Sequence, residues 1–505
     1  MRNAGWRFPS RFLYFLIISG YIFYILHLSF FEAIINCISL CLLSLELFLI
    51  FDTTKKHRLR KTDFIDLPAD YKPFVSILVP ICREPAEVVK STLTSLSNLD
   101  YENYEVYALV NNTPYDKDVE IIRKICNCLG EKLKFFYIPE IEGAKAGVLN
   151  YALRLISSET EIIGIIDSDY VVERDFLKKT VGYFKNQEIA VVQLPQDYFL
   201  DDTPASKGMY HAYRYFFSTV MNTCNEYNAA SFMGTMGLIR RSVLERIGGF
   251  SEEVITEDSE IGIRIHELGY KTIYIDRSKG KGLMPYSYKA YKKQRARWVF
   301  GNMQTIMKNL KFFISGKLNF MQKLCYLAQN TIWFNNLFIP FWIIIFSSIG
   351  LVSFSFAFLV PYLAFLLSRS LGFFFAMPAN TAVSLKERIY AFISFLSLTL
   401  PMATEWIKCL IYPKKGFWRT PKFKENSRVI GCIQEGLPEF LILLLSGFAF
   451  VLGILKNQVI LATGAFINGL IYFSVVWQIY GFFKLSRKEK DENWINFATL
   501  EETAS

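Results

Sequence analysis

The sequence predicts an α/β domain inserted between groups of transmembrane helices. Residues from about 70 to 310 alternate short apolar runs with helical patterns, which is typical of an α/β domain with a mainly parallel sheet. Long apolar stretches flank this region on both sides. Of the 505 residues, 52% are hydrophobic and 46 are Phe, more than an ordinary soluble domain carries. The chain is therefore expected to be a membrane protein.

Four apolar runs give the clearest strands of the inserted domain. They cover residues 74–79, 105–110, 133–138 and 162–166. Each is short and is followed by turn residues and a helical pattern, so we expect the four to lie in one sheet.

The apolar stretches outside this domain have the length of membrane spans. Residues 12–30 and 33–51 each approach the roughly 20 residues that cross a bilayer, and residues 332–368 are long enough for two crossings. Residues 438–455 and 459–482 supply two more. Because a second apolar segment follows the first so closely, we expect an anchor rather than a cleaved signal peptide.

Basic residues predict the orientation of these spans. Lys and Arg are concentrated in residues 2–11, 55–61, 414–424 and 484–490, so all four stretches should be cytoplasmic. This requires an even number of crossings between them. The segment 388–412 contains Pro401, Glu405 and Lys408, which favours an interfacial or re-entrant helix and leaves about six crossings. Seven crossings remain an alternative.

Two aspartates follow the apolar run that ends near residue 166. If Asp167 and Asp169 continue the strand, their side chains point to the same side and converge on one ligand. Two carboxylates suit Mg²⁺ or Mn²⁺, which proteins commonly share with substrate phosphates. The alternative is a solvated acidic turn.

A second acidic motif, Thr256-Glu257-Asp258, precedes a helical pattern. Thr256 is expected to cap that helix, which places both acids in its first turn, where the helix dipole favours negative charge. An ionised carboxylate fixed at a helix start suits a general base, and Asp258 is the candidate. Most such helix starts are only caps, so that alternative stays open.

A third motif places Gln294, Arg297 and Trp298 on one face of a helix, because they are three and four residues apart. An indole offers a flat surface for stacking on a sugar, a guanidinium binds phosphate, and a carboxamide both donates and accepts hydrogen bonds. The alternative is an amphipathic helix at a membrane surface.

With these motifs the chain resembles the processive family 2 glycosyltransferases of membranes, which include cellulose, hyaluronan and β-glucan synthases. The resemblance covers most of the chain and keeps the order of the family's motifs. These are Ser76-Ile-Leu-Val-Pro80, Gly143-Ala-Lys145-Ala-Gly147-Val-Leu-Asn150, Asp167-Ser-Asp169, Ser231-Phe-Met-Gly-Thr235, Thr256-Glu-Asp258 and Gln294-x-x-Arg297-Trp298.

The resemblance implies a GT-A-type fold and a role for each motif residue. Asp258 would be the catalytic base, and Asp169 with Asp167 would hold Mg²⁺ or Mn²⁺ and the diphosphate. The residues implied on the donor side are Glu84, Asn111, Lys145, Asp167, Gln294 and Arg297. Those implied on the acceptor side are Phe232, Met233, Gly234, Glu257 and Trp298. Asn111 departs from the family, where many relatives carry an aspartate that reads uracil.

A basic loop between the later apolar segments is similar to the segment that closes over the donor in cellulose synthases. Phe417, Thr420 and Lys422 keep the family's spacing, whereas Arg419 stands where relatives usually carry Val. A loop that attracts lipid headgroups is the alternative.

The resemblance also implies substrate, partners and location. The sequence is more similar to bacterial β-1,3- and branched-glucan synthases of capsules than to hyaluronan synthases. We expect UDP-glucose as donor, a growing polysaccharide as acceptor, and a multi-pass protein of the plasma membrane with its catalytic domain in the cytoplasm. A synthase of an N-acetylglucosamine-containing polymer such as hyaluronan, and a non-processive enzyme that glycosylates a lipid phosphate, are the alternatives.

The expected division is an N-terminal transmembrane hairpin (1–52), a GT-A domain with interfacial helices (53–325) and a C-terminal transmembrane region (326–505). The last would contain an interfacial helix and the loop 413–424. The net charge of +10 is explained by cytoplasmic loops and a diphosphate substrate, without nucleic acid. Nine scattered cysteines and four histidines offer neither a disulfide framework nor a zinc site.

Overall fold

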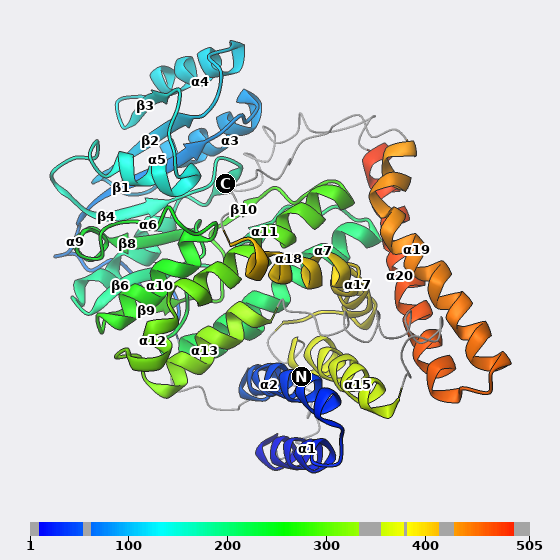
Figure 1. Cartoon of the computed structure of the whole chain (residues 1–505). Coiled ribbons are helices and arrows are strands. Elements are labelled where there is room, and N and C mark those ends of the chain that lie inside the picture. Colours follow the sequence, from blue (N-terminus) through cyan, green and yellow to red (C-terminus); the bar gives the residue numbers. More distant parts are fainter. Residues whose placement is uncertain (1–9, 54–61, 333–354, 378–380, 414–428, 489–505) are drawn as a thin grey trace.

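The computed structural model describes residues 10–53, 62–332, 355–377, 381–413 and 429–488. A sheet flanked by helices lies at one end, and long apolar helices lie at the other (Figure 1). Between them run the helices that connect the two parts. The predicted α/β fold with membrane helices is confirmed.

The large sheet has seven strands in the described residues, in the order β3-β2-β1-β4-β8-β6-β9. Its strands are β1 (Phe74–Ile81), β2 (Tyr104–Asn111), β3 (Leu133–Ile138), β4 (Thr160–Ile165), β6 (Ile189–Gln193), β8 (Gly237–Arg240) and β9 (Lys271–Tyr274). The first four match the predicted strands. They are mutually parallel, whereas β8 runs antiparallel to both β4 and β6. The sheet is therefore mixed but mainly parallel, as predicted.

Helices cover both faces of this sheet. Successive side chains of β1 point to opposite faces of the sheet. Val75, Ile77 and Val79 are buried in one hydrophobic cluster, and Leu78 is buried in a second one. The flanking helices are α3 (Ala86–Ser97), α4 (Lys117–Cys128), α5 (Ala144–Ala152), α6 (Phe176–Thr180), the 3₁₀-helix η1 (Val181–Lys185), α9 (Arg241–Arg246) and α10 (Glu257–Glu267). A small second sheet of β5 (Tyr170–Val172), β10 (Gly280–Gly282) and β7 (Asp197–Tyr198) lies beyond the carboxyl end of β4.

A layer of helices separates the sheet from the apolar helices (Figure 1). It contains α7 (Pro204–Tyr215), the π-helix η2 (Phe216–Met221), α8 (Asn222–Glu226), α11 (Tyr288–Lys308), α12 (Leu310–Ser315) and α13 (Phe320–Thr331). Helix α11 packs on α18 (Thr399–Ile411), and α7 packs on α17 (Leu385–Leu396). Both α17 and α18 are shorter than the roughly 20 residues that span a bilayer, and the interfacial placement of residues 388–412 stays a prediction.

Four helices of the described residues are long and apolar enough to cross a membrane, at 32–53, 356–376, 436–455 and 459–484. They belong to α2 (Phe30–Thr53), α15 (Phe356–Leu371) with the π-helix η3 (Gly372–Ala376), α19 (Val429–Leu455) and α20 (Val459–Lys488). Helix α1 (Ser10–Ile25) is apolar but shorter. Much of the predicted span pair at 332–368 lies outside the described residues, so the count of six stays a prediction.

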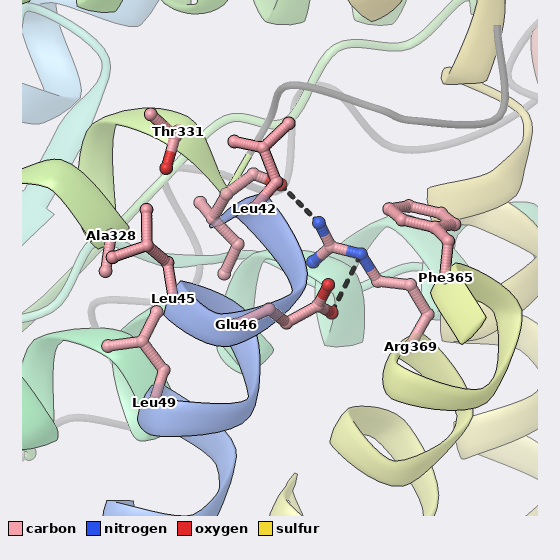
Figure 2. Close-up of a pocket in the computed structure, with 9 residues that line it drawn as sticks. Leu42, Leu45, Glu46, Leu49, Ala328, Thr331, Phe365 and Arg369 are labelled. Atoms are coloured by element: carbon pink, nitrogen blue, oxygen red, sulfur yellow. Dashed lines mark hydrogen bonds and ion pairs between the residues drawn. The ribbon is translucent and has the colours of Figure 1, made fainter. Parts of the chain in front are cut away.

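A buried ion pair joins α2 to α15 beside a small cavity (Figure 2). Arg369 Nε lies 2.9 Å from Glu46 Oε1, and the hydroxyl of Ser368 donates to Glu46 Oε2 at 2.9 Å. The guanidinium also donates to the carbonyl of Ile332, where α13 ends. Both charged side chains are almost fully buried. The pair therefore fixes α2, α13 and α15 relative to one another.

Arg369→Met is expected to destabilise the protein by about 3–5 kcal/mol, because it leaves the Glu46 carboxylate buried without its partner. Thermal unfolding in detergent measures the effect. The double variant Glu46→Leu/Arg369→Met should recover much of the loss, since neither charge then remains. A double variant no more stable than Arg369→Met would contradict this account.

Candidate active site

Lys145 brings together three of the predicted motifs. It lies in the first turn of α5, which begins after Gly143 in the left-handed conformation, with a φ of 76°. Its ammonium lies 2.6 Å from Asp167 Oδ1 and donates to the carbonyl of Gly234 at 2.7 Å. The residues of three separate sequence motifs therefore meet at one charged group.

The aspartate pair lies in a turn and not on a strand, because β4 ends at Ile165. The expectation that strand alternation aligns the two carboxylates is therefore wrong. The backbone N–H of Asp167 donates to the Thr235 hydroxyl at 3.0 Å, and Asp169 Oδ2 accepts from the N–H of Leu283 at 3.2 Å. Tertiary contacts orient both residues. Burial raises the pKa of Tyr198, and the nearby Asp169 and Asp167 raise it further.

Helix α10 begins at Glu257, as the second motif predicts. Thr256 occupies the N-cap position but makes no side-chain capping bond, so that part of the expectation is wrong. Its hydroxyl lies 3.2 Å from the hydroxyl of Thr305 on α11. The threonine thus ties the start of α10 to the helix of the third motif.

Asp258 lies directly against Gly234. A Cβ on Gly234 would come within 2.5 Å of Asp258 Oδ2, and Gly234 has a φ of 76°. A residue without a side chain is needed there for both reasons. Asp258 Oδ1 also accepts from the N–H of Ser259 at 2.7 Å, which fixes the carboxylate.

The charges of the site perturb one another. Burial raises the pKa values of Glu257 and Asp258, and their mutual repulsion adds to the shift of Glu257. Burial opposes the charge of Lys145, but the carboxylates of Asp167, Glu257 and Asp258 raise its pKa overall. Burial lowers the pKa of Arg297, and the same three carboxylates counteract it. Arg297 remains a cation, since a guanidinium does not deprotonate in proteins.

The third motif lies on α11, as predicted, and two of its residues contact Tyr213 of α7. The Tyr213 hydroxyl donates to Gln294 Oε1, and the Trp298 indole meets the Tyr213 ring edge-on at 5.8 Å. Gln294 is buried, whereas Arg297 and Trp298 are partly exposed. Arg297 is electrostatically coupled to Glu257, Asp258 and Asp167, so it belongs to the charged part of the site.

A cavity that is open to solvent lies beside Asp258. Its walls come from α7, η2, the start of α10, α11, α13 and the segments before β7 and β8. The lining residues are Gln196, Tyr213, Phe216, Phe217, Met233, Thr256, Asp258, Ser259, Arg295, Trp298, Asn302 and Gln329. Aromatic rings alternate there with amides and hydroxyls, the chemistry that suits sugar rings.

Two glutamines that the sequence analysis did not identify hold the floor of this cavity. The N–H of Met233 donates to Gln193 Oε1 at 2.8 Å, and Gln196 Nε2 donates to the carbonyl of Met233 at 2.7 Å. The Tyr198 hydroxyl in turn donates to Gln196 Oε1 at 2.8 Å. Isolated glutamines carry no motif signal, so only the tertiary structure reveals this role.

Phe232 is fully buried and packs in the core beside Gly237, so Met233 rather than Phe232 lines the cavity. Glu84 lies just past the end of β1, as predicted. Asn111 directs its amide nitrogen into the sheet, at 3.1 Å from the carbonyls of both Ile81 and Leu109. Both of its N–H donors are thus used by the protein. Phe417, Arg419, Thr420 and Lys422 lie outside the described residues.

The donor set around Asp167 and Asp169 fits a hard divalent cation. In the described part of the chain, no three or more His, Cys, Asp or Glu side chains form a metal-binding group. Mg²⁺ commonly takes only one or two carboxylates and completes its coordination with water and substrate phosphates. Asp167 and Asp169 would supply two such carboxylates, and that pattern suits them better than a site built wholly from protein.

The central part of the chain is similar to known proteins. Residues 162–368 match the sequence profile of Glycosyl transferase family group 2. The cellulose synthase catalytic subunit of Xanthomonas axonopodis pv. citri is 28% identical over 273 residues, 52% of this chain and 36% of that protein. Cellulose synthase 1 catalytic subunit of Komagataeibacter xylinus is 26% identical over 336 residues, 65% of this chain and 41% of that protein. The matches thus span less than half the length of these relatives.

The fold is similar to that of a solved mannosyltransferase from Pyrobaculum calidifontis, in complex with GDP-mannose and Mn²⁺. The TM-score is 0.53 at 20% sequence identity, over 76% of this chain and 99% of that one. At this identity the likeness concerns the fold alone, and it supports the GT-A-like architecture.

Gly234→Ala is expected to lower activity at least about tenfold, because the new methyl group displaces the Asp258 carboxylate. Gly248→Ala is the matched control, since Gly248 has a similar φ of 80° but nothing within 4 Å of the added Cβ. Both variants should lose about 1 kcal/mol of stability from backbone strain. Only Gly234→Ala should lose activity. Equal activity of the two variants would contradict the contact with Asp258.

Proposed function

We propose that this chain, which carries a glycosyltransferase domain of family 2, is a processive, inverting β-glucan synthase. It transfers glucose from UDP-glucose to a growing polysaccharide and moves the polymer across the plasma membrane. The observation that carries this proposal is the cavity that starts at Asp258 and is walled by α11, η2 and α13. An acceptor longer than one sugar needs a path away from the base, and the lining of this cavity continues from Asp258 to η2 and α13.

Asp258 is the proposed general base. Its carboxylate accepts the proton of the acceptor hydroxyl while that oxygen forms a bond to the anomeric carbon and the bond to the diphosphate oxygen breaks. Attack from the side opposite the leaving group converts an α-linked donor into a β linkage. Gly234 and the N–H of Ser259 hold the carboxylate in place for this step.

Lys145 and Arg297 are the proposed cations of the donor site. Departure of the nucleoside diphosphate develops negative charge, which fixed cations in a buried site stabilise more strongly than water does. Lys145 pairs with Asp167, and Arg297 is electrostatically coupled to the same carboxylate. When bound, Mg²⁺ or Mn²⁺ held by Asp167 and Asp169 would screen the charge of the diphosphate.

Trp298, Met233 and Tyr213 are the proposed acceptor contacts, since all three line the cavity. Beyond them the lining continues to Phe216 and Gln329. These residues belong to η2 and α13, next to α2 and its apolar stretch. The product would therefore leave the site toward the membrane helices, with the catalytic domain on the cytoplasmic side.

Glucose is proposed because cellulose synthases are among the relatives and the motif context resembles glucan synthases. Asn111 uses its amide nitrogen within the sheet, so we expect Glu84 and its neighbours at the end of β1 to contribute more to nucleoside binding. Phe232 would support the acceptor floor from beneath. The loop from residue 413 to 424 is proposed to close over the donor.

Purified protein in lipid vesicles should build high-molecular-weight, β-glucanase-sensitive polymer from UDP-glucose with Mg²⁺ or Mn²⁺. UDP-galactose and UDP-N-acetylglucosamine are the comparison donors. Asp258→Asn should lose at least about a hundredfold in rate, the usual contribution of a general base, while remaining folded. Polymer from UDP-N-acetylglucosamine alone would refute the glucan assignment. A labelled lipid in place of polymer would favour the lipid-phosphate enzyme.

The pH dependence tests the base. Asp258 accepts a proton only when ionised, so activity falls as the pH drops through its pKa. Burial raises that pKa above its usual value of 3.8, so we expect the acid limb of kcat/KM at a correspondingly higher pH. UDP binding over the same range is the control for unfolding or loss of donor affinity. An acid limb at or below pH 3.8 would contradict the assignment.

A further inference from the structure

We propose that Arg295, inside the Gln294-to-Trp298 motif, is a positioning residue that fixes the aromatic wall of the acceptor cavity by stacking on Tyr213 and Trp298. The inference rests on the proposed function only in taking this cavity as the acceptor site. Arg295 was not among the predicted site residues, because the motif's face contains Gln294, Arg297 and Trp298.

The guanidinium of Arg295 lies among three aromatic rings. Its central carbon is 4.1 Å from the ring centroid of Tyr213, 4.7 Å from that of Trp298 and 5.5 Å from that of Tyr291. The residue is only 2% exposed, yet it contributes to the lining of the cavity. A buried guanidinium in this setting is stabilised by the negative faces of the rings and orients them in return.

Tyr213 is the ring through which Arg295 acts most directly. Arg295 covers a face of the Tyr213 ring, while the Tyr213 hydroxyl donates to Gln294 Oε1. Trp298 then meets the same ring edge-on, with an interplanar angle of 70°. Arg295 thus fixes the face of the Tyr213 ring, and Gln294 fixes its hydroxyl. Tyr213 in turn contacts the Trp298 indole.

The same set of contacts extends to the floor of the cavity. Tyr213 lies 4.8 Å from Tyr198, measured between ring centroids, and the Tyr198 hydroxyl donates to Gln196. Gln196 donates to the carbonyl of Met233. Loss of the Arg295 guanidinium should therefore disturb both the Trp298 wall and the Met233 floor, and so weaken the hold on a sugar.

The test separates acceptor binding from donor binding. Arg295→Met removes the charge and the plane but keeps a long side chain, and Arg295→Lys keeps only the charge. Lys289→Met is the matched control, because Lys289 is an exposed cation on the same helix. The probes are cellotetraose and laminaritetraose for the acceptor site and UDP for the donor site, each by calorimetry. A polymerisation assay gives the UDP released per glucose incorporated.

Arg295→Met should lower the affinity for whichever tetrasaccharide the wild type binds. The expected loss is about tenfold, within the range of a buried cation–π contact. The affinity for UDP should change by less than about twofold. It should also raise the UDP released per glucose incorporated. Arg295→Lys should recover only part of the loss, because an ammonium cannot stack as a plane. Lys289→Met should behave as the wild type.

A double-mutant cycle tests whether Arg295 acts through the indole. In a Trp298→Ala background, Arg295→Met should cost clearly less tetrasaccharide affinity than it does alone. Full additivity, unchanged binding by Arg295→Met, or complete rescue by lysine would overturn the inference, as would a wild type that binds neither tetrasaccharide. Failure of the wild type to polymerise UDP-glucose would instead overturn the proposed function, because oligosaccharide binding is measured independently.

Discussion

The arrangement of the site depends on the ion pair between Lys145 and Asp167. Without a cation there, the carboxylates of Asp167, Glu257 and Asp258 would repel one another in a buried region, where separated charges cost several kcal/mol. The same ammonium donates to the carbonyl of Gly234, the residue that touches Asp258. One lysine therefore joins the turn of Asp167, the segment around Gly234 and the start of α10.

Helix α11 serves both the chemistry and the membrane region. Arg295 and Trp298 line the cavity, and Gln294 accepts a hydrogen bond from Tyr213 in its wall. The preceding turn of α11 contacts α19 and the segment between α17 and α18. Lys292 Nζ lies 2.6 Å from the buried carboxylate of Glu439 in α19, and the Tyr288 hydroxyl donates to the carbonyl of Ser397 at 2.6 Å. A displacement of the apolar helices would thus be transmitted to the residues around the cavity, which suits an enzyme proposed to couple synthesis to export.

Sequence patterns predicted much of the fold, because strands and spans depend on local periodicity. Runs such as residues 133–138 are apolar, short and followed by turns, and their strand bounds agree with the structure. The site geometry was predicted less well. Strand alternation does not align Asp167 and Asp169, and Thr256 makes no side-chain capping bond on α10. Contacts with Thr235, Leu283 and Thr305 decide these orientations instead. All three partners are remote in sequence, so local rules could not identify them.

The sequence by itself determined the class of fold, the apolar helices and which motif residues carry the charges and rings that the chemistry needs. Those properties belong to individual side chains and to their spacing along one element. Only the tertiary structure decided that Lys145 pairs with Asp167, that Gln193 and Gln196 hold Met233, and that Arg295 stacks between Tyr213 and Trp298. These contacts join residues on different elements. How the elements pack decides whether each contact forms, because the energy of a contact depends on its burial and its angle.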